Sequence, residues 1–172
     1  FFDFICFVAI SPRNIYYLTA EKFYRHPFWR PIMEWTGQIK VERTSKNKNQ
    51  VHEAVYEHLK LGHLVGVFPE GTRSPHEDEM LPGFTGAAKY SLTTNTPIIP
   101  VGIKGAYAAW SRHEKKPKIK RVISFTVGEE ISPQGYINEN IEETLRLKLM
   151  TEEIMKSLSK LSDRKYNGIH EL

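Results

Sequence analysis

The sequence has little cysteine, no long apolar run and no linker-like segment across its 172 residues. Its one cysteine, Cys6, cannot form a disulfide within the chain, so folding depends on packing and a reducing compartment is compatible with it. No apolar run approaches the roughly eighteen residues of a membrane-spanning helix, and the longest candidate, residues 1–10, contains Asp3. These absences exclude a disulfide-stabilised miniprotein.

The residues that are present have the composition of a globular protein. Hydrophobic residues make up 40% and charged residues 26% of the chain, which excludes a wholly disordered polypeptide. The length favours one domain. We expect that domain to span residues 1–161 and to be followed by a polar tail at 162–172.

The net charge of +4 is concentrated in one segment. Residues 112–121 carry six basic side chains against one acid, Glu114, which gives this segment +5 and leaves −1 for the remaining chain. The segment is either a solvated loop or a contact for anionic headgroups, nucleic acid or an acidic carrier protein. The six basic residues are Arg112, Lys115, Lys116, Lys118, Lys120 and Arg121.

Hydrophobic patterning predicts alternating strands and helices. Strands are expected over residues 14–20, 38–43, 64–68, 97–103 and 122–127. Helices are expected over residues 1–11, 49–61, 84–94 and 138–161, with short helical pieces over 21–36. The strands at 64–68 and 97–103 have no polar face, as expected for strands buried on both sides. The pattern predicts an α/β fold with a mostly parallel central sheet and helices on both faces.

The segment after the strand at 64–68 is the first place to look for a site, because ligands gather beyond the carboxyl ends of parallel strands. It reads Phe68-Pro69-Glu70-Gly71-Thr72-Arg73-Ser74. It offers a carboxylate, a glycine that lets a ligand approach the backbone, a hydroxyl, and a guanidinium that can fork onto a phosphate. From residue types alone, a solvent-exposed turn with an incidental Glu–Arg pair is the favoured interpretation.

The order of these residues resembles the signature of the glycerolipid acyltransferases, the family of 1-acylglycerol-3-phosphate acyltransferase. Three further blocks agree in order and spacing. In residues 37–43, Gly37 is followed six residues later by Arg43, and residues 98–103 are an apolar stretch with Pro100 at its centre. Residues 81–87 resemble the segment that joins the third and fourth blocks, with Thr85 where the family commonly has lysine. The resemblance covers roughly residues 1–127 and implies a glycerolipid acyltransferase-like fold.

The family's first block is His-x-x-x-x-Asp. Asp3 occupies the place of its aspartate, and the histidine five positions earlier falls upstream of Phe1. We expect an N-terminally truncated, inactive fragment of an active enzyme, the alternative being a relative without the histidine. In the family the histidine is a general base, and Asp3 would fix its tautomer. Asp3 is alternatively an N-cap for the first helix.

The resemblance implies acyl transfer to the hydroxyl of a 1-acylglycerol-3-phosphate, giving phosphatidic acid. The donor would be acyl-CoA or an acylated carrier protein, and no cofactor or metal is expected because a thioester is already activated. It also implies a peripheral or monotopic enzyme on the cytoplasmic face of a membrane, with no nucleic acid among its partners. The acceptor phosphate would be held by Arg43, Glu70, Gly71, Thr72 and Arg73. Supporting motif residues would be Gly37, Phe68, Pro69, Ser74 and Pro100.

Other interpretations of the sequence stay open. The acceptor could be another lysophospholipid or glycerol 3-phosphate, or the chain could be a non-catalytic lipid-binding relative or a basic binding module. The spacing of His52, His58 and His63 does not favour zinc, and residues 76–79 are expected to be a solvated acidic turn. The aromatic residues are expected in the core, with a minority at an acyl-chain tunnel or a membrane interface. They are Tyr16, Tyr17, Phe23, Tyr24, Phe28, Trp29 and Trp35.

Overall fold

A computed structural model describes residues 2–41, 48–110, 113, 118, 123–137 and 140–168. The chain divides into two compact units. One contains Phe1–Ile10 together with Phe68–Leu172, and the other contains Ser11–Val67. No helix in the described ranges is both long and apolar enough to cross a membrane.

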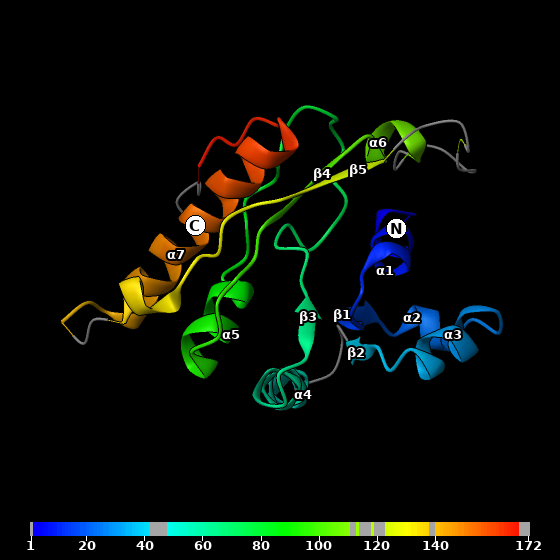
Figure 1. Ribbon diagram of the computed structural model, residues 1–172, viewed down its shortest axis with the longest axis horizontal. Helices are drawn as coiled ribbons and strands as arrows, with labels where there is room; N and C mark the ends of the chain where they lie inside the picture. Colours follow the sequence, from blue (N-terminus) through cyan, green and yellow to red (C-terminus); the bar gives the residue numbers. More distant parts are fainter. Residues whose placement is uncertain are drawn as a thin grey trace. The chain divides into compact units, whose positions relative to one another are not determined.

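The unit Ser11–Val67 is built on a parallel sheet with the strand order β2-β1-β3 (Figure 1). Its strands are β1 (Ile15–Ala20), β2 (Ile39–Val41) and β3 (Leu64–Gly66). Parallel neighbours need crossover connections. Helices α2 (Lys22–Arg25) and α3 (Trp29–Trp35) connect β1 to β2, and α4 (Lys48–Lys60) connects β2 to β3. The buried apolar side chains of this unit are Ile15, Tyr17, Met33, Ile39 and Val55.

A buried glutamine extends the pairing between β1 and β2. Gln38 precedes β2, and its side-chain Oε1 accepts a hydrogen bond from the backbone N–H of Tyr17 at 2.7 Å. Its Nε2 donates to the carbonyl of Ile15 at 3.4 Å. The side-chain amide therefore bonds to one backbone donor and one backbone acceptor of β1, as a neighbouring strand would.

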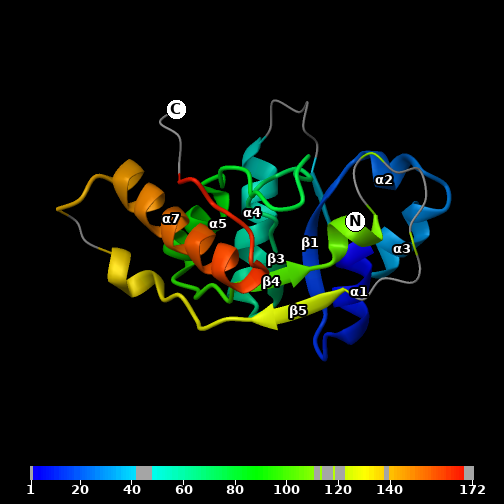
Figure 2. The same cartoon turned by 90° about the horizontal axis from the view of Figure 1, so that it is seen from above.

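Among its described residues, the unit of Phe1–Ile10 and Phe68–Leu172 contains five helical elements and an antiparallel strand pair. Strands β4 (Val101–Lys104) and β5 (Ser124–Val127) point in opposite directions in Figure 2, in the register Val101↔Val127. The helical elements are α1 (Phe2–Ile10), α5 (Gly86–Thr94), α6 (Ala106–Ala109), the 3₁₀-helix η1 (Pro133–Tyr136) and α7 (Glu143–Ser162). Its core cluster consists of Ala88, Ile131, Met150 and Ile154.

The long helix α7 packs closely on β4 because β4 has a glycine at the contact. Gly102 is buried, and a Cβ built on it would lie 2.4 Å from the Cβ of Leu161 in the last turn of α7. The absence of a side chain therefore lets the end of the helix approach the strand. At the other end of the unit, the rings of Phe7 in α1 and Phe125 in β5 lie 5.0 Å apart.

The predicted α/β class is confirmed, as a parallel sheet flanked by helices, and each strand and helix predicted from patterning is present. Four details differ. The strand predicted over 97–103 pairs antiparallel with β5, and α6 and η1 had no sequence signal. The residues of β3 are half-buried, because β3 lies at the edge of the parallel sheet. The interpretation of Asp3 as an N-cap is wrong, because α1 already begins at Phe2.

Candidate active site

The loop at 68–84 is closed on itself by backbone hydrogen bonds. The N–H of Phe84 donates to the carbonyl of Pro69 at 2.9 Å, and the N–H of Gly71 donates to the carbonyl of Phe68 at 3.0 Å. Gly71 has a φ of +63°, in the left-handed region that favours glycine. A Cβ on Gly71 would also lie 2.9 Å from the ring of Phe84, so the motif glycine is required by the tight turn.

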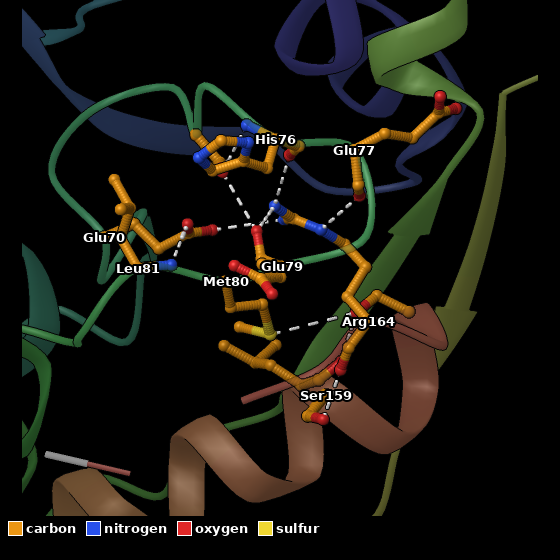
Figure 3. Close-up of polar contacts among 11 residues, drawn as sticks. Glu70, His76, Glu77, Glu79, Met80, Leu81, Ser159 and Arg164 are labelled. Carbon is orange, nitrogen blue, oxygen red and sulfur yellow. Dashed lines mark hydrogen bonds and ion pairs between the residues drawn. The ribbon is translucent and has the colours of Figure 1, made fainter. Parts of the chain in front are cut away.

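Glu70 ties the start of this loop to its end. One carboxylate oxygen, Oε2, accepts a hydrogen bond from the backbone N–H of Leu81 at 2.8 Å. The other, Oε1, lies 3.4 Å from Nη1 of Arg164, which follows α7 in the chain (Figure 3). The Glu70 side chain is 16% exposed and that of Arg164 is 22% exposed. Both oxygens of Glu70 are therefore engaged in holding the loop.

The guanidinium of Arg164 also binds three carbonyls of the acidic turn at 76–79. Its Nε donates to the carbonyl of Glu77 at 3.0 Å, and its Nη2 donates to those of His76, at 3.3 Å, and Glu79 (Figure 3). The side chains of residues 76–79 are exposed, as predicted, but the carbonyls of His76, Glu77 and Glu79 face Arg164. The sequence had no signal for this contact, because Arg164 lies 94 residues from Glu70.

Backbone pairing reinforces the same junction. The N–H of Lys165 donates to the carbonyl of Asp78 at 2.7 Å, and the N–H of Met80 donates to the carbonyl of Lys165 at 2.8 Å. Within the loop, the hydroxyl of Ser74 donates to the carbonyl of Glu79 at 2.9 Å and accepts from the N–H of His76 at 3.1 Å. Ser74 is thus a structural residue of the loop.

Arg73 and Thr72 are the free polar groups of the motif. Both are exposed, and neither side chain makes a hydrogen bond or ion pair with any residue that the structure describes. Glu70, three residues earlier, is fully partnered within the protein. The loop therefore holds a guanidinium and a hydroxyl on a fixed backbone, which is an arrangement suited to binding an anion.

The other predicted site residues are divided between the two units. Asp3 lies in the first turn of α1, in the unit that contains the loop. Gly37 lies in the other unit, where its φ of +66° forms the turn between α3 and β2. Pro100 is buried, and its carbonyl accepts from the N–H of Gly128 at 2.9 Å. Arg43 falls outside the described residues, as does most of the basic segment at 112–121.

Two histidines of the unit Ser11–Val67 form a close pair. The Nδ1 atoms of His58 and His63 lie 3.1 Å apart, so one of them donates a hydrogen bond to the other. The ring of Tyr16 stacks on His63 with a centroid distance of 4.9 Å. Burial, followed by the charge of His63, lowers the pKa of His58. Among the residues that the structure describes, no group of three or more His, Cys, Asp or Glu side chains is arranged to hold a metal.

Comparisons with known proteins agree with these features. Residues 1–104 match the family model described as Acyltransferase. The chain is 24% identical over 157 residues to a 1-acyl-sn-glycerol-3-phosphate acyltransferase of Bacillus subtilis (strain 168), covering 91% of this chain and 73% of that protein. It also resembles the crystal structure of a 1-acyl-sn-glycerophosphate acyltransferase from Thermotoga maritima, with a TM-score of 0.62 and 22% identity. That match covers 88% of this chain, which spans 58% of the length of the solved protein.

Proposed function

The chain belongs to the acyltransferase family, and we propose that it transfers a fatty acyl group from an acyl-thioester to the free hydroxyl of a 1-acylglycerol-3-phosphate, giving phosphatidic acid. The relatives named for this activity support the choice of acceptor. The proposal rests on the state of Arg73. This arginine is exposed and has no counter-ion among the described residues, while the motif carboxylate of Glu70 is already satisfied.

The reaction needs one new ester bond and no change of oxidation state. The acceptor hydroxyl oxygen attacks the thioester carbonyl carbon, the C–S bond breaks, and the thiolate leaves and takes up a proton. We propose that the hydroxyl proton passes to a histidine upstream of Phe1, oriented by Asp3 in α1. The donor is proposed to be acyl-CoA or an acylated carrier protein, without a further cofactor, because the thioester itself is the activated group.

Recognition of the acceptor is assigned to its phosphate. We propose that Arg73 forks onto two phosphate oxygens and that Thr72 donates a hydroxyl hydrogen bond from the adjacent position. Arg43, which ends the family's second block and lies outside the described residues, stays a predicted contact of the acceptor phosphate. Gly71 contributes by the turn that its positive φ permits. Together these groups would select an acceptor that carries a phosphate monoester.

Because the acceptor is a lipid, we propose that the protein binds a membrane surface peripherally or monotopically, on the cytoplasmic face. An apolar stripe on α3 supports this. Phe28, the N-cap of α3, and Ile32 and Trp35 within it are exposed and spaced by four and three residues, which places them on one side of the helix. Trp35 is 89% exposed, and tryptophan favours the interface between lipid and water. The basic segment at 112–121 would add attraction to anionic lipids.

The test is an acyl-transfer assay on the full-length protein with lysophosphatidate, other lysophospholipids and glycerol 3-phosphate as acceptors. We expect lysophosphatidate to be preferred. A charged hydrogen bond contributes about 1.5–3 kcal/mol, so Arg73→Ala should raise the acceptor KM roughly ten- to a hundredfold. The donor KM should change little. Arg73→Lys should restore part of the loss, because an ammonium cannot form the fork.

The matched control for Arg73→Ala is Arg25→Ala. Arg25 is an exposed arginine of α2, outside the family motif, that pairs with Glu21, so its replacement removes the same charge without changing the motif. A preference for a different acceptor in the panel would replace lysophosphatidate as the substrate. Loss of transfer from every acceptor, with anion binding retained, would favour a non-catalytic binding protein.

A further inference from the structure

The segment 163–166, which follows α7, is rigidly attached to that helix. Asp163 ends α7 in the left-handed conformation, with φ +57°, and so redirects the chain. The N–H of Arg164 then donates to the carbonyl of Ser159 at 3.2 Å, and the hydroxyl of Ser159 donates to the carbonyl of Arg164. The backbone of Arg164 is therefore held at both its N–H and its carbonyl.

Tyr166 fastens the far side of the same segment. Its hydroxyl donates to Oε2 of Glu152, in α7, at 2.9 Å. Burial, together with the Glu152 carboxylate, raises the pKa of Tyr166 above its ordinary value, so the phenol stays a neutral donor at physiological pH. Residues 163–166 are thus held against α7 on both sides of Arg164, and the loop at 68–84 rests on a preformed support.

The charge of the loop explains why this support is cationic. Residues 70–81 carry four acids, Glu70, Glu77, Asp78 and Glu79, against one base, Arg73, which gives −3. A loop with that charge repels the phosphate that it is proposed to bind. Arg164 sits beside Glu70 and neutralises the carboxylate nearest in sequence to Arg73. Without that partner, Glu70 is free to compete with the substrate phosphate for Arg73.

The number of acceptors explains why the support is an arginine. One carboxylate and three carbonyls converge on residue 164 from positions 70, 76, 77 and 79. A guanidinium presents five N–H donors in a plane, whereas an ammonium presents three from a single nitrogen. These contacts reach Arg164 at Nε, Nη1 and Nη2, so its donors are spread over the whole fork (Figure 3).

We infer that Arg164 is a positioning residue for the acceptor site: it holds the loop at 70–81 in the shape that presents Arg73 and it withdraws Glu70 from the substrate. This inference rests on the proposed function and deepens it, because it assigns Glu70 to the support of the loop and leaves the phosphate contact to Arg73. Arg164 itself touches no reacting atom.

The experiment compares Arg164→Ala, Arg164→Lys and Lys165→Ala in the full-length protein. Lys165 is the matched control, because its exposed side chain makes no ion pair with any described residue while its backbone holds the same junction. We expect Arg164→Ala to raise the acceptor KM about tenfold while the donor KM stays within about twofold. Arg164→Lys should recover part of this, and Lys165→Ala should leave both constants unchanged.

Amide hydrogen exchange gives a readout that does not depend on acyl transfer. The amides of Met80 and Leu81 should exchange faster in Arg164→Ala than in Lys165→Ala, because their acceptors are Lys165 and Glu70. Adding Glu70→Gln to Arg164→Ala should cost no further acceptor affinity than Arg164→Ala alone, because the two residues act as one unit.

The outcomes separate the two proposals. If the wild-type protein transfers no acyl group to lysophosphatidate, the proposed function fails, and unchanged exchange in Arg164→Ala would overturn the support role independently. If the wild type is active, an unchanged acceptor KM in Arg164→Ala overturns the inference. An equal effect of Arg164→Ala on the acceptor KM and the donor KM, together with a lowered Tm, also overturns it, since that combination indicates general destabilisation. Should Arg164→Ala not fold, Arg164→Lys decides by the same KM comparison.

Discussion

Replacing Gly102 by alanine tests the packing that places the support of the loop. A Cβ at this position would lie 2.4 Å from the Cβ of Leu161 and 2.5 and 2.7 Å from its carbonyl carbon and oxygen. Ordinary van der Waals contact begins at 3.4 Å, so the closest pair must separate by about 1 Å. Two of the three atoms are backbone, so no rotamer change removes the clash, and α7 itself must move.

The expected cost follows from the kind of atoms that clash. Overpacking a core typically destabilises a protein by about 1–3 kcal/mol, and a clash with backbone belongs at the upper end, about 3 kcal/mol. In a chain of 172 residues each kcal/mol lowers Tm by about 2–4 °C, which predicts a fall of roughly 6–12 °C. Because Arg164 follows Leu161 by three residues, the same shift should also weaken its contacts with the loop.

The assay is thermal and urea unfolding followed by circular dichroism, with Gly135→Ala as the matched control. Gly135 lies in η1, has no left-handed φ, and a Cβ there would have no atom within 4 Å. Alanine at that position should be neutral or stabilise slightly, by restricting the unfolded chain. If Gly102→Ala unfolds within 1 °C of Gly135→Ala, the close approach of α7 to β4 is wrong, and the placement of Arg164 is wrong with it.

The remaining predictions concern the unit Ser11–Val67. Because the pKa of His58 is lowered in the folded state, the unfolded state binds a proton at this histidine first as the pH falls. The contribution of His58 to the free energy of unfolding is therefore present above about pH 6.5 and is lost as the pH falls below it. Urea midpoints at pH 7.5 and 5.5 should therefore differ less in His58→Gln than in the wild type, and an equal difference would contradict this. On anionic vesicles, Trp35→Glu should weaken binding about tenfold, through the loss of apolar burial. Leu61→Glu, at another exposed apolar residue, should have a smaller effect, and equal effects would remove the role of α3.

Much of the fold was predictable because its signals are local. The apolar spacing along α7 and the β-branched and aromatic content of β1 placed those elements correctly. The elements α6 and η1 have four residues each, so an apolar spacing cannot repeat within them and periodicity does not detect them. The antiparallel pairing of β4 with β5 also escaped prediction, since it depends on a connection of 19 residues, 105–123, without a hairpin signal.

The site was predictable only in part, for the same physical reason. The motif at 68–74 located the loop, and Gly71 proved to have the positive φ that its position in a tight turn requires. The roles of Glu70 and Arg73 were not separable from sequence, because both are charged and three residues apart. Their separation depends on which of them meets a counter-ion, and the counter-ion of Glu70 is 94 residues away.

Choosing Arg164 from the sequence would have required the geometry of α7 as well as the charge of the loop. A loop of charge −3 calls for a cation, but the chain contains 24 lysines and arginines. Which of them reaches the loop depends on where a helix of 20 residues ends, because each residue turns a helix by about 100°. One residue more or less in α7 would point residue 164 elsewhere. The left-handed Asp163 fixes that end point, and the proposed acceptor site therefore depends on a helix terminus that contains none of the motif residues.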